Sequence, residues 1–135
     1  KKNKAKIFID FAHTPDALKN VLKEASQMGK GKLHVVFGCG GERDKYKRPL
    51  MGKIASKYAD IIVITDDNPR NENPETIRRQ IINRSLKMIE ISDRRKQRQK
   101  ALKEAYTDKC TEEDIAKLKR LLSYTSLSYT LIFRP

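Results

Sequence analysis

Residues 35–52 read V-V-F-G-C-G-G-E-R-D-K-Y-K-R-P-L-M-G. An apolar run enters a loop with three glycines, and charged residues lead from that loop to Pro49. Proline suits the first turn of a helix, because the N–H that it lacks would be unpaired there. A strand that enters a glycine-rich loop and then a helix can present backbone N–H groups to an anion. The stretch therefore predicts either an anion site or an ordinary strand-to-helix turn with a solvated basic rim.

Two further blocks place polar residues directly after an apolar run. Residues 9–18 read I-D-F-A-H-T-P-D-A-L, and residues 64–70 read I-T-D-D-N-P-R. Open α/β sheets bind ligands where their strands end. Both blocks therefore indicate positions at the ligand-binding edge of a sheet.

The apolar runs between these blocks predict an alternation of strands and helices. Runs of apolar and β-branched residues predict strands at 6–11, 33–37, 60–65 and 88–91, and we expect all but the last to be buried parallel strands. Helical spacing of apolar residues predicts one helix after Thr14, one over residues 49–58 with Leu50 on its apolar face, and one after Asn73. Thr14 and Asn73 are suitable N-caps, each followed by a proline.

Together, the three blocks resemble the C-terminal domain of the Mur ligases over about residues 6–95. The resemblance implies a Rossmann-like, three-layer α/β domain with a mainly parallel sheet. It also implies ATP-dependent amide bond formation, with ATP and Mg²⁺ as cofactors of the full-length enzyme. The D-N-P-R block is that of members that add meso-diaminopimelate to UDP-N-acetylmuramoyl-L-alanyl-D-glutamate in peptidoglycan synthesis, whereas lysine-adding relatives lack the arginine.

The same resemblance assigns candidate site residues. Arg43, Asn68 and Arg70 are expected to contact diaminopimelate. Four residues are expected to face the nucleotide: His13, Asp16, Lys45 and Arg48. No catalytic or metal-binding residue is expected in this chain.

The residues alone leave other interpretations open. Arg70 and Asn68 would suit the carboxylate and amine of an amino acid, but they also fit an Asx-Pro turn. Without the resemblance, His13 is interpreted as an ordinary loop histidine, and Lys45 and Arg48 as ordinary solvated basic residues.

The resemblance ends near residue 95. The family motif G-K-G-H-E is absent, residues 96–135 contain no glycine, and we expect no apolar strand of the kind that presents the motif. Residues 95–106 and 111–122 predict helices, whereas residues 123–133 predict either a strand or disorder. We therefore expect a truncated family-type domain over 1–95 and a divergent, mostly helical tail over 96–135. A frameshift, a lineage-specific replacement and a fusion each explain such a tail.

Composition narrows the class of protein. The chain has 135 residues and no run of about 18 apolar ones, so we expect no transmembrane helix. No apolar segment follows the lysine-rich start, so a secretory signal is not expected. Cys39 and Cys110 fit reduced thiols of a cytoplasmic protein, and small size alone explains a cysteine between Gly38 and Gly40, so we do not expect Cys39 to be a nucleophile. We expect a monomer.

The formal charge of +13 raises nucleic acid as a partner. The excess is spread along the chain, and only residues 94–100 form a dense basic cluster without interleaved aromatic residues. We therefore do not expect nucleic-acid binding, and keep a basic module that binds nucleic acid or a protein as the non-enzymatic alternative. The enzymatic alternatives are a lysine-adding Mur ligase and a folylpolyglutamate-type ligase, which Arg70 and the G-C-G-G-E-R-D block disfavour.

The sequence also limits what the chain can do alone. It lacks the phosphate-binding motif G-x-x-x-x-G-K-[ST] and does not begin with Met. We expect it to belong to a longer polypeptide and to be inactive as an isolated chain. Without the family's last strand and helix, apolar surface would be exposed and stability would be marginal.

Overall fold

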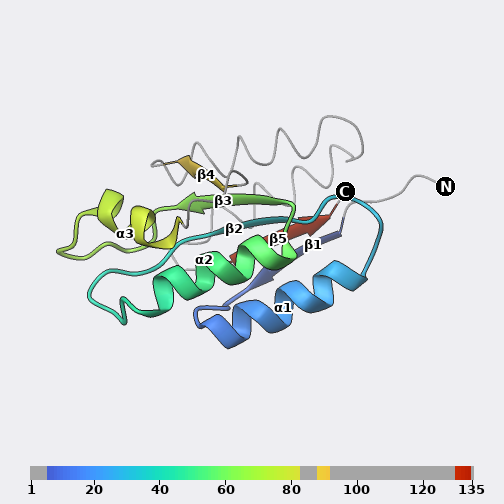
Figure 1. The fold of residues 1–135 in the computed structure, drawn as a ribbon, viewed down its shortest axis with the longest axis horizontal. Helices are drawn as coiled ribbons and strands as arrows, with labels where there is room; N and C mark the ends of the chain where they lie inside the picture. Colours follow the sequence, from blue (N-terminus) through green and yellow to red (C-terminus); the bar gives the residue numbers. More distant parts are fainter. Residues whose placement is uncertain (1–5, 83–87, 92–129, 135) are drawn as a thin grey trace.

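The computed structural model describes residues 6–82, 88–91 and 130–134. Strands and helices alternate along most of this part (Figure 1). In chain order they are β1 (Lys6–Asp10), α1 (Pro15–Gln27), β2 (His34–Phe37), α2 (Lys47–Tyr58), β3 (Ile61–Thr65), α3 (Pro74–Ile81), β4 (Met88–Ile91) and β5 (Thr130–Arg134). The alternation confirms the predicted α/β class.

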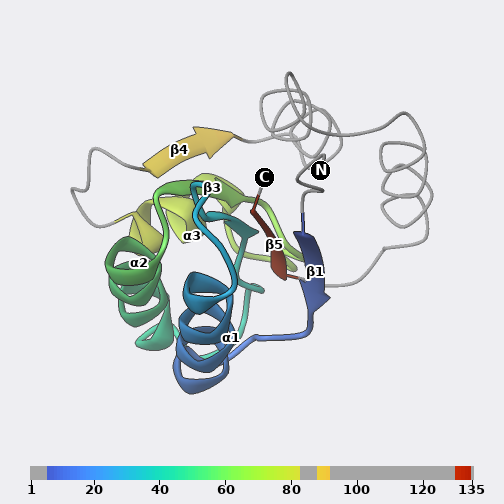
Figure 2. The same ribbon diagram turned by 90° about the vertical axis from the view of Figure 1, so that its right-hand side faces the viewer.

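The described strands form one sheet in the order β1-β5-β2-β3-β4. β2 pairs with β3 and β3 with β4 in parallel, whereas β5 is antiparallel to both β1 and β2. Each connection from β1 through β4 moves across the sheet in the same direction. Because such crossovers are right-handed, α1, α2 and α3 lie on one face, with α2 packed against both neighbours (Figure 2). A second helical layer, expected for a three-layer fold, would lie outside the described residues.

The pairing of β1 differs from the expectation of a buried parallel strand. β1 lies at the edge of the described sheet and pairs only with β5, from Lys6 with Arg134 to Asp10 with Thr130. Residues 123–133 were predicted to be either a strand or disordered, and the strand is confirmed for Thr130–Arg134 (T-L-I-F-R), which is inserted between β1 and β2. The predicted helices over 95–106 and 111–122 lie outside the described residues, and the division at residue 95 stays a prediction.

α1 and α3 begin where their caps were predicted. The side chain of Thr14 accepts a hydrogen bond from the N–H of Ala17 (3.2 Å), and the side chain of Asn73 accepts one from the N–H of Glu75 (2.9 Å). In each case a proline follows the cap. In both helices the cap therefore satisfies an N–H group of the first turn that has no partner within the helix.

α2 begins at Lys47, two residues before the predicted Pro49, and its cap Tyr46 makes no side-chain hydrogen bond to the helix. Pro49 still lies in the first turn, where its missing N–H is tolerated. Leu50 does not join the buried face as predicted, because 51% of it is exposed.

The core lies between the sheet and the three helices. β2 and β3 are almost wholly buried, as their continuous apolar sequences predicted. The buried core residues from the strands and helices include Val35, Phe37, Ile62, Ile64, Leu18, Leu22, Met51, Ala55, Ile77 and Ile81.

α2 and α3 approach closely at one glycine. A β-carbon on Gly52 would lie 1.9 Å from the carbonyl oxygen of Ile81, so only glycine fits this crossing. None of the helices that the structure describes is long and apolar enough to cross a membrane.

Candidate functional site

Three loops follow the carboxyl ends of β1, β2 and β3. β1 is antiparallel to β5, and β5 to β2, so β1, β2 and β3 run in the same direction. Their loops, at residues 11–14, 38–46 and 66–73, therefore lie at one edge of the sheet (Figure 1). Ligands of open α/β sheets bind at this edge.

The second and third of these loops are joined by hydrogen bonds. The N–H of Gly41 donates to the carbonyl of Asn68 (2.8 Å), and Nη1 of Arg70 donates to the carbonyl of Gly41 (2.6 Å). The amide of Asn71 donates to Oε1 of Glu42 (2.8 Å). We call the two segments, residues 38–46 and 66–73, the loop pair.

Two glycines make this close approach possible. A β-carbon on Gly38 would lie 2.3 Å from the carbonyl oxygen of Thr65, and one on Gly41 would lie 1.8 Å from that of Pro69. Both contacts are with backbone, which cannot move aside as a flexible side chain can. The glycine-rich loop thus serves to pack against the neighbouring loop.

Each loop contains one residue in the left-handed region that favours glycine. These residues are Glu42 (φ 51°) and Arg70 (φ 50°). Non-glycine residues in this conformation are uncommon and cluster at functional sites, where surrounding contacts hold them. Here those contacts are the hydrogen bonds of the loop pair.

Glu72 lies at the centre of the loop pair. Its carboxylate accepts two hydrogen bonds from the guanidinium of Arg48 (2.9 and 3.0 Å) and one from the N–H of Glu42 (2.5 Å), and Lys45 Nζ lies 3.8 Å away. The hydrogen bonds from Arg48 and Glu42 lower the pKa of Glu72 to about 2. The carboxylate is therefore ionised at neutral pH.

Arg48 does not lie on a ligand-facing surface, where the resemblance had put it. Its side chain is fully buried, and besides Glu72 it donates to the side chain of Gln80 (2.6 Å) and to the carbonyl of Gly40 (3.1 Å). A guanidinium enclosed in this way binds the protein itself. The burial of Arg48 therefore speaks against the expected contact with the nucleotide.

The structure brings the three residues expected to contact diaminopimelate together at the loop pair. A β-carbon on Gly40 would lie 3.0 Å from Nη1 of Arg70 and 3.7 Å from Cγ of Arg43, so both side chains come close to this glycine. Arg43 is exposed and makes no hydrogen bond or ion pair with the residues described. The side chain of Asn68 accepts a hydrogen bond from the N–H of Arg70 (3.2 Å), which is the Asx turn that the sequence also allowed.

The residues expected to face the nucleotide are more dispersed. His13 is exposed beside Phe11, with 4.8 Å between ring centroids, and Lys47 Nζ donates to the His13 carbonyl (2.8 Å). This contact ties the loop after β1 to the start of α2. Asp16 is exposed in the first turn of α1, and Lys45 is exposed at the rim of the loop pair.

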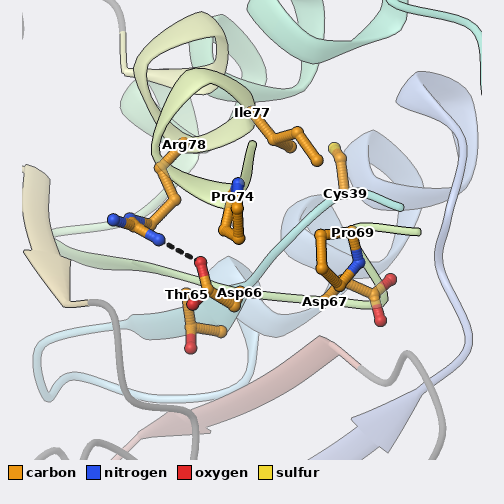
Figure 3. A pocket seen from close by; sticks show the side chains of 8 residues that line it. All are labelled: Cys39, Thr65, Asp66, Asp67, Pro69, Pro74, Ile77 and Arg78. Atoms are coloured by element: carbon orange, nitrogen blue, oxygen red, sulfur yellow. Dashed lines mark hydrogen bonds and ion pairs between the residues drawn. The ribbon is translucent and has the colours of Figure 1, made fainter. Parts of the chain in front are cut away.

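A small hollow is lined by residues of the loop pair and of α3 (Figure 3). Asp66 and Arg78 point toward each other on one side of it and form an ion pair, while Arg78 also donates to Glu90 of β4 (2.9 Å). Cys39 lies near Ile77 on the other side, and burial raises its pKa to about 11. The thiol is therefore protonated at neutral pH, which argues against a nucleophilic role.

Sequence reasoning missed Glu72 and the internal role of Arg48. The only local sign was that Glu72, two residues after D-N-P-R, is the one carboxylate of residues 71–74. Nothing in the sequence pairs it with a residue 24 positions away.

Comparison with known proteins gives consistent matches. The family model described as Mur ligase, glutamate ligase domain matches residues 1–116. A protein of Mesorhizobium japonicum named UDP-N-acetylmuramoyl-L-alanyl-D-glutamate–2,6-diaminopimelate ligase is 54% identical over 92 residues, which are 68% of this chain and 19% of the relative. A protein of Aquifex aeolicus with the same name is 53% identical over 103 residues, which are 74% of this chain and 21% of the relative.

A solved structure of a ligase with this name superposes with a TM-score of 0.66 at 38% identity, covering 82% of this chain and 25% of that one. The chain spans about a fifth of the length of the curated relatives that it matches. The match to the family model continues to residue 116, past residue 95, where the resemblance in motifs ends.

Proposed function

Because this chain belongs to the family of Mur ligase, glutamate ligase domains, we propose that it is the amino-acid-binding part of an ATP-dependent ligase that adds meso-diaminopimelate to UDP-N-acetylmuramoyl-L-alanyl-D-glutamate. The names of its relatives support this reaction. The observation that carries the proposal is the loop pair, with Arg43 and Arg70 both close to Gly40. We further propose a monomer that works in the cytoplasm.

The chemistry of the ligand explains why two guanidinium groups are needed. Meso-diaminopimelate carries a carboxylate and an amine at each end, whereas lysine lacks the second carboxylate. A guanidinium offers a planar fork that matches a carboxylate. Arg70, Arg43 and Asn68 together would hold the distal carboxylate and amine and leave the other amine free to react.

In the proposed reaction ATP phosphorylates the glutamate carboxylate of the UDP-linked dipeptide. The free amine of diaminopimelate then attacks the acyl phosphate, the new C–N bond forms, the C–O bond to phosphate breaks, and the amine loses a proton. This chain contributes placement of the amine. His13, Asp16 and Lys45 are proposed to face the nucleotide from the same edge of the sheet.

The remaining parts of the reaction need residues beyond this chain's own. The described residues hold no cluster of three or more His, Cys, Asp or Glu side chains suited to a metal ion, so we assign the Mg²⁺ that accompanies ATP to none of them. The sequence contains no G-x-x-x-x-G-K-[ST] loop for the phosphates. We therefore propose that the chain alone does not turn over; ligase activity above a blank without added domains would contradict this.

Binding of the amino acid by the chain tests the proposal. We expect meso-diaminopimelate to shift the backbone NMR signals of Gly40 and Asn68, and to bind about tenfold more tightly than L-lysine, since one charge-assisted bidentate contact is at stake. Replacing Arg70 by lysine keeps the charge but removes the fork, so this preference should fall to about twofold or less.

The matched control is Arg79→Lys, an exposed arginine of α3 whose ion pair is with Glu75, away from the loop pair. It should leave both affinities unchanged. Equal affinity of the unmodified chain for the two amino acids would refute the assignment to diaminopimelate. Binding of a short RNA at moderate salt, with neither amino acid bound, would favour the non-enzymatic alternative instead.

A further inference from the structure

We propose that Glu72 is a positioning residue of this site, which holds the loop pair in one arrangement and thereby sets where Arg43, Lys45 and Arg70 lie. The identity of the ligand rests on the proposed function. The geometry rests on the contacts of Glu72 itself.

The carboxylate of Glu72 is occupied by the protein. Oε1 accepts from the N–H of Glu42 (2.5 Å) and from Nη2 of Arg48 (3.0 Å), while Oε2 accepts from Nη1 of Arg48 (2.9 Å) and lies 3.8 Å from Lys45 Nζ. A carboxylate has about four lone-pair sites. Glu72 therefore has little capacity left for a ligand, and acts on ligand binding through its neighbours.

Besides its bonds to the buried Arg48, Glu72 makes three contacts that restrain residues expected to meet a ligand or their neighbours in the chain. The bond to the Glu42 N–H holds a left-handed residue whose immediate successor is Arg43. The proximity of Lys45 restrains a side chain at the exposed rim. Arg70 lies in the turn that the Glu72 N–H closes on the Pro69 carbonyl (3.0 Å).

Only an ionised carboxylate meets all of these demands. The Arg48 side chain is fully buried and needs a counter-ion, because a buried charge without a partner is strongly unfavourable. Glutamine is nearly the same shape but would present N–H groups to donors. The pKa of about 2 keeps Glu72 charged wherever the protein is expected to work.

The consequence for a ligand lies in the spacing of the two arginines. Arg43 and Arg70 approach Gly40 from different loops, and Glu72, which belongs to the loop of Arg70, is bonded to the loop of Arg43 through Glu42. If the loops shift, two guanidinium groups can no longer meet the same end of one amino acid. We therefore expect Glu72 to govern the preference for a dicarboxylic diamino acid over lysine, although it does not touch either.

Two variants of the full chain test this, with a matched control. Glu72→Leu removes the acceptor but leaves Arg48 buried and unpaired, so it risks unfolding. The double variant Arg48→Met with Glu72→Leu removes both charges, which commonly preserves folding. Glu75→Gln changes an exposed acid three residues away whose partner is Arg79.

The first readout is amide hydrogen exchange, which needs no ligand. In the double variant we expect the Glu42 N–H to exchange about tenfold faster relative to the N–H groups of β3, while Glu75→Gln leaves the ratio unchanged. A general loss of stability would accelerate both groups alike. An unchanged ratio in the folded double variant would overturn the proposal.

The second readout is the ratio of dissociation constants for meso-diaminopimelate and L-lysine. We expect the preference for diaminopimelate to fall about tenfold in the double variant and to persist in Glu75→Gln. A preference equal to that of the unmodified chain would also overturn the proposal. If the unmodified chain binds neither amino acid, the proposed function fails, and the exchange ratio alone decides the role of Glu72.

Discussion

Replacing Gly52 by alanine tests whether α2 and α3 are as close as the structure has them. The new β-carbon would lie 1.9 Å from the carbonyl oxygen of Ile81 and 3.0 Å from its carbonyl carbon. Both are backbone atoms of α3, so no side-chain rotation relieves the contact. The two helices would have to separate by roughly 1 Å before the closest contact became tolerable, which a close-packed core resists.

Two opposing effects set the magnitude. Glycine to alanine in a helix interior gains up to about 1 kcal/mol of intrinsic helix stability. Overpacking of a buried contact typically costs about 1–3 kcal/mol, and a clash between two backbones belongs at the upper end. We expect the clash to outweigh the helix propensity, so that the free energy of unfolding falls by about 1–2 kcal/mol and the melting temperature by about 4–8 °C for a domain of this size.

Urea and thermal unfolding followed by circular dichroism measure this effect. The control is Lys53→Ala, an exposed position of the same helix, which should change the free energy of unfolding by less than about 0.5 kcal/mol. A Gly52→Ala variant as stable as the unmodified chain, or more stable, would refute the close crossing of α2 and α3.

Three further predictions concern the loop pair. Gly41→Ala places a β-carbon 1.8 Å from the Pro69 carbonyl oxygen, so it should separate the loops and weaken meso-diaminopimelate binding about tenfold, as a titration would measure. The folded pKa of Cys39 is raised from 9.0 to about 11, so the stability that its protonated thiol contributes should decline between those pH values; unfolding of the chain and of Cys39→Ala, compared from pH 8.5 to 11, checks this. The folded pKa of Glu72 is lowered from 4.5 to about 2, so its contribution should be complete above pH 4.5 and vanish as the pH falls to about 2, which a carboxyl NMR titration with parallel unfolding would follow.

Local signals in the sequence were enough to predict most of the fold. Thr14 and Asn73 identified the helix starts because capping depends on residues within one turn. β2 and β3 were predicted because strands buried on both faces are apolar throughout. The place of β1 at the edge depends on pairing with Thr130–Arg134, and no local pattern encodes a contact over that distance.

The contrast between local signals and distant contacts also explains which parts of the candidate site could be predicted. Motifs identified Arg43, Asn68 and Arg70, and the structure places them near one another, while their binding role stays a prediction. A charged side chain in a basic run carries no sign of whether it is solvated or buried, and so Arg48 was assigned to the surface. Its burial depends on Glu72 and Gln80, which reach it from the next loop and helix.

The insertion of β5 between β1 and β2 constrains the order of folding. β1 has no other partner among the described strands, and its register pairs Lys6 with Arg134, so it can join the sheet only after a strand more than a hundred residues away has arrived. Until then the edge of β2 stays open to pairing with other chains, whereas β2, β3 and β4 can assemble from near neighbours. Contacts this distant slow folding. During synthesis on the ribosome the parallel strands β2, β3 and β4 should therefore pair first, and β1 should join the sheet last, together with β5.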